Sequence, residues 1–152
     1  MDTIRQKIIS AIESGLASIR KSGGYQTDIG AKVEVAKSAI DQRHLPAVVL
    51  WPQSETGVKL QGRNKMTMSA RIEGIVSLGA NEDAVKIGEM ILGDIRKRLE
   101  SLTEDITGGY GDHVEYTSGG VENYPEPGET AVNCPAVYNI VYKTKTGDPF
   151  NQ

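Results

Sequence analysis

The chain has 152 residues, of which 38% are hydrophobic and 24% charged, and a formal net charge of −3. This composition is typical of one folded domain and excludes collagen and coiled coils. No apolar run approaches the roughly 20 residues that cross a bilayer, which excludes a membrane-spanning protein. Cys134 is the only cysteine, so it has no partner for an internal disulfide, which indicates a reducing compartment. The first residues lack the pattern of a signal peptide. We therefore expect a protein made in the cytoplasm, without a membrane partner.

Acidic residues are concentrated in one segment of the chain. Residues 103–134 contain seven of the 20 Asp and Glu residues and no Lys or Arg, whereas all 17 basic residues lie elsewhere. The rest of the chain therefore carries a formal charge of +4. This asymmetry predicts an acidic loop region that repels polyanions such as the phosphate backbone of nucleic acids.

Two segments show the spacing of apolar residues that is typical of a helix with one buried face. The first predicts a helix over residues 3–21, which Thr3 can cap. Its apolar stripe consists of Ile4, Ile8, Ile12, Leu16 and Ile19. The second predicts a helix over residues 81–102, which Asn81 can cap. Its stripe consists of Ala84, Ile87, Ile91, Ile95, Leu99 and Leu102.

Runs of apolar residues and alternating patterns predict strands in the remaining sequence. The segment 45–52 is apolar on both faces and predicts an interior strand at the centre of a sheet. Long alternations predict amphipathic strands at residues 66–78 and 136–143, and shorter ones predict strands at 31–36 and 114–116. The first of the long strands leaves the face with Thr67, Ser69, Arg71, Glu73 and Ile75 for solvent or another subunit.

The predicted order of helix, three strands, helix, short strand and closing strand indicates an α+β fold. We expect a single domain over residues 1–152, with two helices packed on one face of a mostly antiparallel, mixed sheet of four or five strands. Two polar regions accompany these elements: a loop or arm at residues 53–65 and a long acidic loop region at residues 103–134.

The sequence offers few groups for catalysis or metal binding. His44 and His113 are the only histidines, so a zinc site of the usual kind would need both, together with Cys134 and a carboxylate, at unrelated spacings. Asp112, His113 and Glu115 are close in sequence, but neighbours on a strand point to opposite faces, so the first two would diverge. Cys134 lies at the entrance of a strand, where a small buried thiol is expected. We therefore expect no enzyme activity, cofactor or bound metal.

A combination of segments gives the chain a resemblance to a known family. These segments are Gly23–Gly30 after the first predicted helix, the strand segments Leu45–Val49 and Ile72–Gly74, the predicted helix Asn81–Leu102 and the final run Tyr142–Pro149. Together they resemble tail terminator proteins of long-tailed bacteriophages, and the resemblance spans most of the chain.

The resemblance implies a small α+β subunit that forms a hexameric ring on the end of a completed tail tube, ends tube polymerisation and presents the surface for head attachment. Its partners would be further copies of itself, the tail tube protein and a neck or head-completion protein. DNA would pass through the ring without specific binding. The protein would belong to the virion tail after assembly in the host cytoplasm, and the resemblance implies no catalytic residues.

Contacts between neighbouring subunits are the candidate functional sites, because a head-to-tail ring needs two different complementary surfaces on each subunit. We expect part of residues 103–134 to face the channel of the ring or a neighbouring subunit. The candidates are three basic residues of the polar arm and three acidic residues of the acidic region: Lys59, Arg63, Lys65, Glu122, Glu126 and Glu129. The two sets would form opposite halves of one contact.

Three other interpretations remain open from the sequence. One is a generic host adaptor domain, which would remain monomeric until an unrelated partner binds. A phage head-completion or neck protein would share this size, charge and predicted fold. A small cytosolic enzyme, a different class of protein, would use Asp112, His113 and Glu115 as an acid and base cluster.

Overall fold

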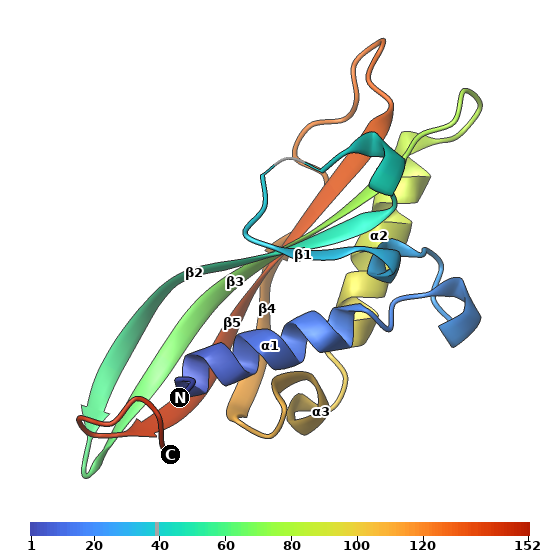
Figure 1. Ribbon diagram of the computed structural model, residues 1–152. Coiled ribbons are helices and arrows are strands. Elements are labelled where there is room, and N and C mark those ends of the chain that lie inside the picture. Colours follow the sequence, from blue (N-terminus) through green and yellow to red (C-terminus); the bar gives the residue numbers. More distant parts are fainter. Residues whose placement is uncertain (39) are drawn as a thin grey trace.

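The computed structural model describes residues 1–38 and 40–152 and contains one five-stranded sheet with three α-helices (Figure 1). The strands are β1 (Val33–Val35), β2 (Ala47–Leu60), β3 (Arg63–Ser77), β4 (Gly111–Gly119) and β5 (Ala131–Lys145). The helices are α1 (Ile4–Leu16), α2 (Ala84–Leu99) and α3 (Thr103–Thr107), and short 3₁₀ turns occur at Lys21–Gly23, Ile29–Ala31 and Gln42–His44. The predicted α+β class is confirmed, and the short helix α3 was not predicted.

The sheet is mixed, in the order β1-β2-β3-β5-β4, and only β1 and β2 are parallel. The predicted central position of the strand at 45–52 is wrong, because β3 occupies the centre and β2 lies beside it. β1 pairs with β2 only from Val48 to Leu50. In the described part of the chain, the outer side of β2 beyond Leu50 pairs with no other strand.

α1 begins where its sequence predicts it. The side chain of Thr3 accepts a hydrogen bond from the backbone N–H of Gln6 at 3.1 Å, which satisfies one of the free donors at the start of a helix. The helix ends at Leu16 instead of residue 21, and the hydroxyl of Ser18 donates to the carbonyl of Gly15 at 2.7 Å. This local bond competes with continued helical pairing. Ile19 is nevertheless fully buried, so its predicted place in the core is confirmed.

α2 lies directly on the sheet. Asp83 caps it, in place of the predicted Asn81, by accepting from the backbone N–H of Val85 at 3.0 Å. A Cβ at Gly74 would lie 2.3 Å from the Cγ2 of Ile91, so only glycine permits this close approach of helix and strand. Leu102 is 79% exposed because α2 ends at Leu99, and the prediction that it belongs to the buried stripe is wrong.

One hydrophobic core joins the helices to one face of the sheet. Alternate residues of β3 and β5 enter it, as the sequence predicts, among them Met68, Ile72, Tyr138 and Ile140. The apolar faces of α1 and α2 and Ile106 of α3 complete the core. All three helices therefore cover the same side of the sheet, and the opposite face carries the predicted polar residues of β3.

Residues 53–65 are an arm with regular strand structure. They form the distal halves of β2 and β3, which pair from Thr56 and Thr67 to the turn at residues 61–62. β5 adds a third strand, because it pairs with β3 as far as Lys145. We call this three-stranded end of the sheet, residues 53–67 and 141–145, the arm. Figure 1 shows it reaching past the N-terminal end of α1. The third strand is needed because an isolated hairpin is only marginally stable in water.

The acidic region at residues 103–134 is not one long loop. It contains α3, all of β4 and the first four residues of β5. The short strand predicted at 114–116 is the middle of β4, which has nine residues. The connection that remains spans residues 120–130, and we call it the acidic loop.

Candidate functional site

The arm and the acidic loop lie at opposite ends of the same sheet (Figure 1). β3 and β5 pair along their full 15 residues, from Arg63 with Lys145 at the tip of the arm to Ser77 with Ala131 beside the acidic loop. At about 3.3 Å per residue, the two ends are roughly 45–50 Å apart. The basic and acidic candidate residues of one chain therefore cannot meet each other.

Strand register divides the basic candidates between two faces of the arm. Arg63 and Lys65 lie on the side of the sheet opposite the helices, because residues of β3 alternate and Ile72 faces the core. Lys59 pairs with Asn64 and lies on the other face. Two lysines that the sequence did not nominate complete the basic face, since Lys143 and Lys145 pair with the nominated residues of β3. The alternation of residues in β5 is the sequence signal that could have placed these two lysines on one face.

Two aliphatic side chains lie within this basic face. Val58 and Leu60 of β2 are 60% and 42% exposed, and they pair with Lys65 and Arg63 respectively. Residues directly opposite on antiparallel strands share one face, so the aliphatic and basic groups are neighbours. The tip of the arm therefore presents a surface that is both apolar and cationic.

The base of the arm is fastened to α1 and β5. β2 has a bulge between Pro52 and Glu55, and the Glu55 carboxylate lies 3.3 Å from the guanidinium of Arg5 and accepts a hydrogen bond from the hydroxyl of Tyr142. Burial, assisted by the Glu55 carboxylate, raises the pKa of Tyr142 far above its usual range. These contacts join three elements at the point where helix cover ends, so they fix the direction in which the arm leaves the body.

The acidic candidates also divide into two groups. Glu122 lies 3.1 Å from Arg71 on the face of the sheet opposite the helices, where it attaches the acidic loop to β3. Glu126 and Glu129 are exposed and line an open hollow of about 480 Å³ between the acidic loop and the connection from β3 to α2. Leu78 and Pro125 contribute apolar lining to the same hollow. The free acidic end therefore combines two carboxylates with apolar surface.

Both edges of the sheet have one unpaired side in the described part of the chain. The outer side of β2 is unpaired over the arm, and β4 ends the sheet on the opposite edge. Such edges expose backbone donors and acceptors that can pair with another strand. The two edges are different in sequence, so contacts that join one edge to the other would be heterologous.

The group Asp112, His113 and Glu115 lies exposed on β4. The Asp112 carboxylate is 3.3 Å from the ammonium of Lys143, at a place where the pairing of β4 with β5 shifts by one residue. Among the described residues, no cluster of three or more His, Cys, Asp or Glu side chains has the arrangement of a metal site. This geometry gives the group no enclosed, water-excluded space in which to act as acid and base.

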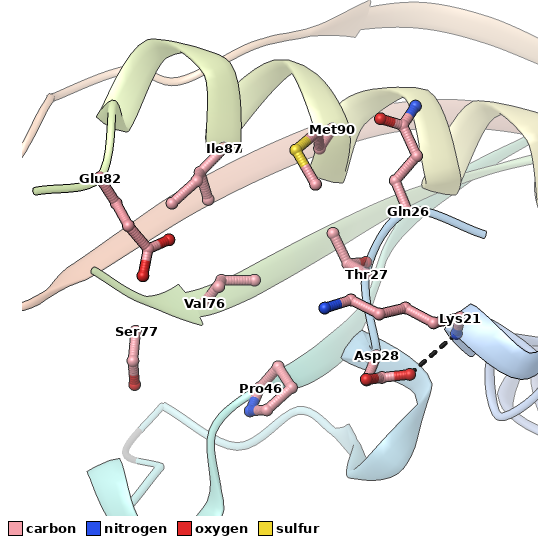
Figure 2. A pocket seen from close by; sticks show the side chains of 10 residues that line it. All are labelled: Lys21, Gln26, Thr27, Asp28, Pro46, Val76, Ser77, Glu82, Ile87 and Met90. Atoms are coloured by element: carbon pink, nitrogen blue, oxygen red, sulfur yellow. Dashed lines mark hydrogen bonds between the residues drawn. The ribbon is translucent and has the colours of Figure 1, made fainter. Parts of the chain in front are cut away.

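A further hollow of about 300 Å³ lies between α2, the end of β3 and the segment after α1 (Figure 2). Two of its polar side chains form internal hydrogen bonds: the Asp28 carboxylate accepts from the backbone N–H of Lys21, and the Thr27 hydroxyl donates to Asp94 at 2.6 Å. Asp94 is buried on α2 and also accepts from the backbone N–H groups of Gln26 and Thr27. The arrangement fastens this segment to α2, so we assign it a structural role.

Comparison with protein families and curated proteins assigns the chain to no family. No protein-family model matches the chain, and no curated protein matches its sequence. Among the described residues, no helix is long and apolar enough to cross a membrane. The assignment of function therefore depends on the geometry and on the sequence resemblance.

Proposed function

We propose that the protein is a tail terminator of a long-tailed bacteriophage. Copies of the chain form a hexameric ring on the end of the completed tail tube, end its polymerisation and present the surface to which the neck or head-completion protein attaches. The protein belongs to the virion tail after assembly in the host cytoplasm, and it acts as a structural protein without catalytic residues.

The observation that supports the proposal most is the chemical difference between the two ends of the sheet. One end is a basic arm with two exposed aliphatic side chains, and the other is an acidic end with an open, partly apolar hollow. Subunits that use two different surfaces associate head to tail, and such contacts close into a ring when the rotation between neighbours allows it. The sequence resemblance supports a ring that caps a tail tube.

The acidic groups also suit a channel through which DNA passes. Residues 103–134 have no Lys or Arg, so this segment itself supplies no cation with which to retain phosphates. A ring with some of these residues on its lumen would let DNA slide by electrostatic repulsion. The partners of the ring are thus further copies of the chain, the tail tube protein and the neck protein.

The test mixes the purified protein with preformed tail tubes and images their ends by electron microscopy. We expect a ring on one end of each tube and no further elongation when tube protein is added. The variant Arg63→Glu, at the tip of the arm, should lose ring formation. Lys86→Glu, an exposed residue of α2, is the matched control and should cap tubes normally.

Bare tubes that continue to elongate with the unmodified protein would contradict the proposal. Deletion of the gene then separates the neighbouring function. Loss of a terminator gives tails of variable, excessive length, whereas loss of a neck protein leaves tails of normal length without heads.

A further inference from the structure

The tip of the arm has groups that its own chain does not satisfy. Val58 and Leu60 are exposed aliphatic side chains, and burying them in a contact removes apolar surface from water. Of the neighbouring cations, Lys143 pairs with Asp112, but Arg63, Lys65 and Lys145 make no ion pair with any described residue. A partner for this surface must supply apolar area and negative charge together.

The hollow at the opposite end of the sheet has the complementary composition. Its walls include Leu78, Ala80, Pro125 and Pro127, and its rim carries Glu126 and Glu129. Neither of these carboxylates forms an ion pair or a side-chain hydrogen bond with a described residue. Glu122, in contrast, is already engaged by Arg71 and lies outside this hollow.

We propose that the tip of the arm of one copy docks into this hollow of a second copy. Val58 and Leu60 pack on the apolar wall, while Arg63, Lys65 and Lys145 face Glu126 and Glu129. A polyanion such as nucleic acid would match the cations but would leave the two aliphatic side chains in water. A second copy matches both features, which is why it is the occupant that the surfaces favour.

The contact has to be intermolecular and directional. The arm and the hollow are separated by the length of β3, roughly 45–50 Å, so one chain cannot close on itself. Each copy keeps a free arm at one end and a free hollow at the other, as a heterologous contact requires. The proposal deepens the proposed function, and it rests on that function for the ring as the product of docking.

The proposed contact includes only some of the six candidate residues named from the sequence. Lys59 lies on the face of the arm that points away from the basic cluster, and Glu122 serves the attachment of the acidic loop. Neither belongs to the docking surface. Charge reversal at Lys59 or Glu122 should therefore affect docking less than reversal at Lys65 or Glu129.

Cysteine cross-linking tests the contact directly. Gln61→Cys lies at the tip of the arm and Thr130→Cys lines the hollow, and both positions are exposed, so the variants should fold. After oxidation, a mixture of the two variants should give a disulfide-linked dimer. The matched control mixes Gln61→Cys with Ser14→Cys, an exposed residue of α1, and should give at most background dimer. Buried Cys134 stays in place in all three variants.

Charge exchange provides the second measurement. Lys65→Glu and Glu129→Lys should each weaken self-association about tenfold in sedimentation velocity, and the double variant should recover most of that loss. Equal cross-linking in the test and control mixtures, or a double variant no better than the singles, would overturn the docking proposal.

The same cross-linking experiment on capped tubes tests the docking contact separately from the terminator function. Tubes that are capped without a cross-link between residues 61 and 130 would overturn the docking contact and leave the terminator function intact. A specific cross-link with tubes that remain uncapped would support the docking contact and contradict the terminator function.

Discussion

The two halves of the sheet differ in what covers them. In the body, α1 and α2 bury one face of β3 and β5, and residues such as Ile12 and Ile91 are fully buried. In the arm, residues 53–60 of β2 are all exposed, and only Tyr142 and Thr144 of β5 are buried. The strands are continuous, so the difference comes from what packs on them.

This difference predicts that one part of the sheet stabilises the fold and another part serves association with a partner. Buried side chains of the body remove apolar area from water when the chain folds, whereas Val58 and Leu60 of the arm keep much of theirs in water. The arm keeps its shape through ladder hydrogen bonds to a third strand and through the contacts of Glu55 at its base. Truncations of buried side chains in the body should therefore change unfolding, and changes to the exposed side chains at the tip of the arm should change assembly.

The largest contrast is expected from truncating one aliphatic side chain in each half. Ile12→Ala in α1 should lower the free energy of unfolding by about 3–4 kcal/mol, because it leaves a cavity in the core. Leu60→Ala in the arm should change it by less than about 0.5 kcal/mol. Urea denaturation followed by circular dichroism measures both values. Equal losses in the two variants would show that the arm is part of the stabilising core.

A second contrast concerns two carboxylates. Asp94→Asn should cost about 3 kcal/mol, since the buried carboxylate accepts hydrogen bonds from Gln26 and Thr27 and an amide nitrogen would face some of these donors. Glu55→Gln, at the partly exposed base of the arm, should cost less than about 1 kcal/mol. Thermal denaturation of both variants checks the order. A larger loss for Glu55→Gln would mean that the base of the arm carries global stability.

Two tyrosines of β5 give a smaller contrast of opposite sign. The hydroxyl of Tyr138 is buried without a hydrogen-bond partner among the described residues, and burial raises its pKa far above the usual range. Tyr138→Phe should stabilise the protein by about 1 kcal/mol, because it removes an unsatisfied polar group while the ring still meets Tyr116 edge to face. Tyr142→Phe should destabilise it by about 1 kcal/mol, because Glu55 loses a donor. Destabilisation by both changes would show that the Tyr138 hydroxyl has a partner in solution.

The last contrast does not concern stability and measures how readily a thiol reagent reaches a cysteine side chain in the body and in the arm. Burial raises the pKa of the Cys134 thiol to about 11, so at pH 8 it is protonated and shielded. A thiol reagent should not label the folded protein, and labelling should begin only as denaturant opens the sheet. Thr56→Cys, on the exposed strand of the arm, should label at once. Rapid labelling of the unmodified protein would contradict the burial of Cys134.

Much of the body could be predicted because its signals are local. The four-residue spacing from Ile4 to Leu16 and the alternation in β3 each depend on neighbours within one element. The ends of elements were less accurate, as at Leu102, because tertiary contacts decide where a helix stops. The nine residues of β4 were detected only in part, since only Val114 and Tyr116 are apolar and register shifts on both sides of them interrupt the alternation.

The candidate site was predicted only in composition. The sequence marks a basic arm and an acidic region, but it does not show that Lys143 and Lys145 join Arg63 and Lys65 while Lys59 faces away. Those neighbours come from strand register, which joins residues that are far apart in the chain.

The sequence by itself determined the α+β class, the buried faces of the helices and long strands, and the separation of acidic from basic segments, because periodicity and composition act over short distances. The tertiary structure alone decided that Asp94 is a buried fastening, that Glu122 is engaged by Arg71, and that the arm and the hollow lie at opposite ends of one sheet. These features depend on pairings between distant residues, which only the folded chain brings together.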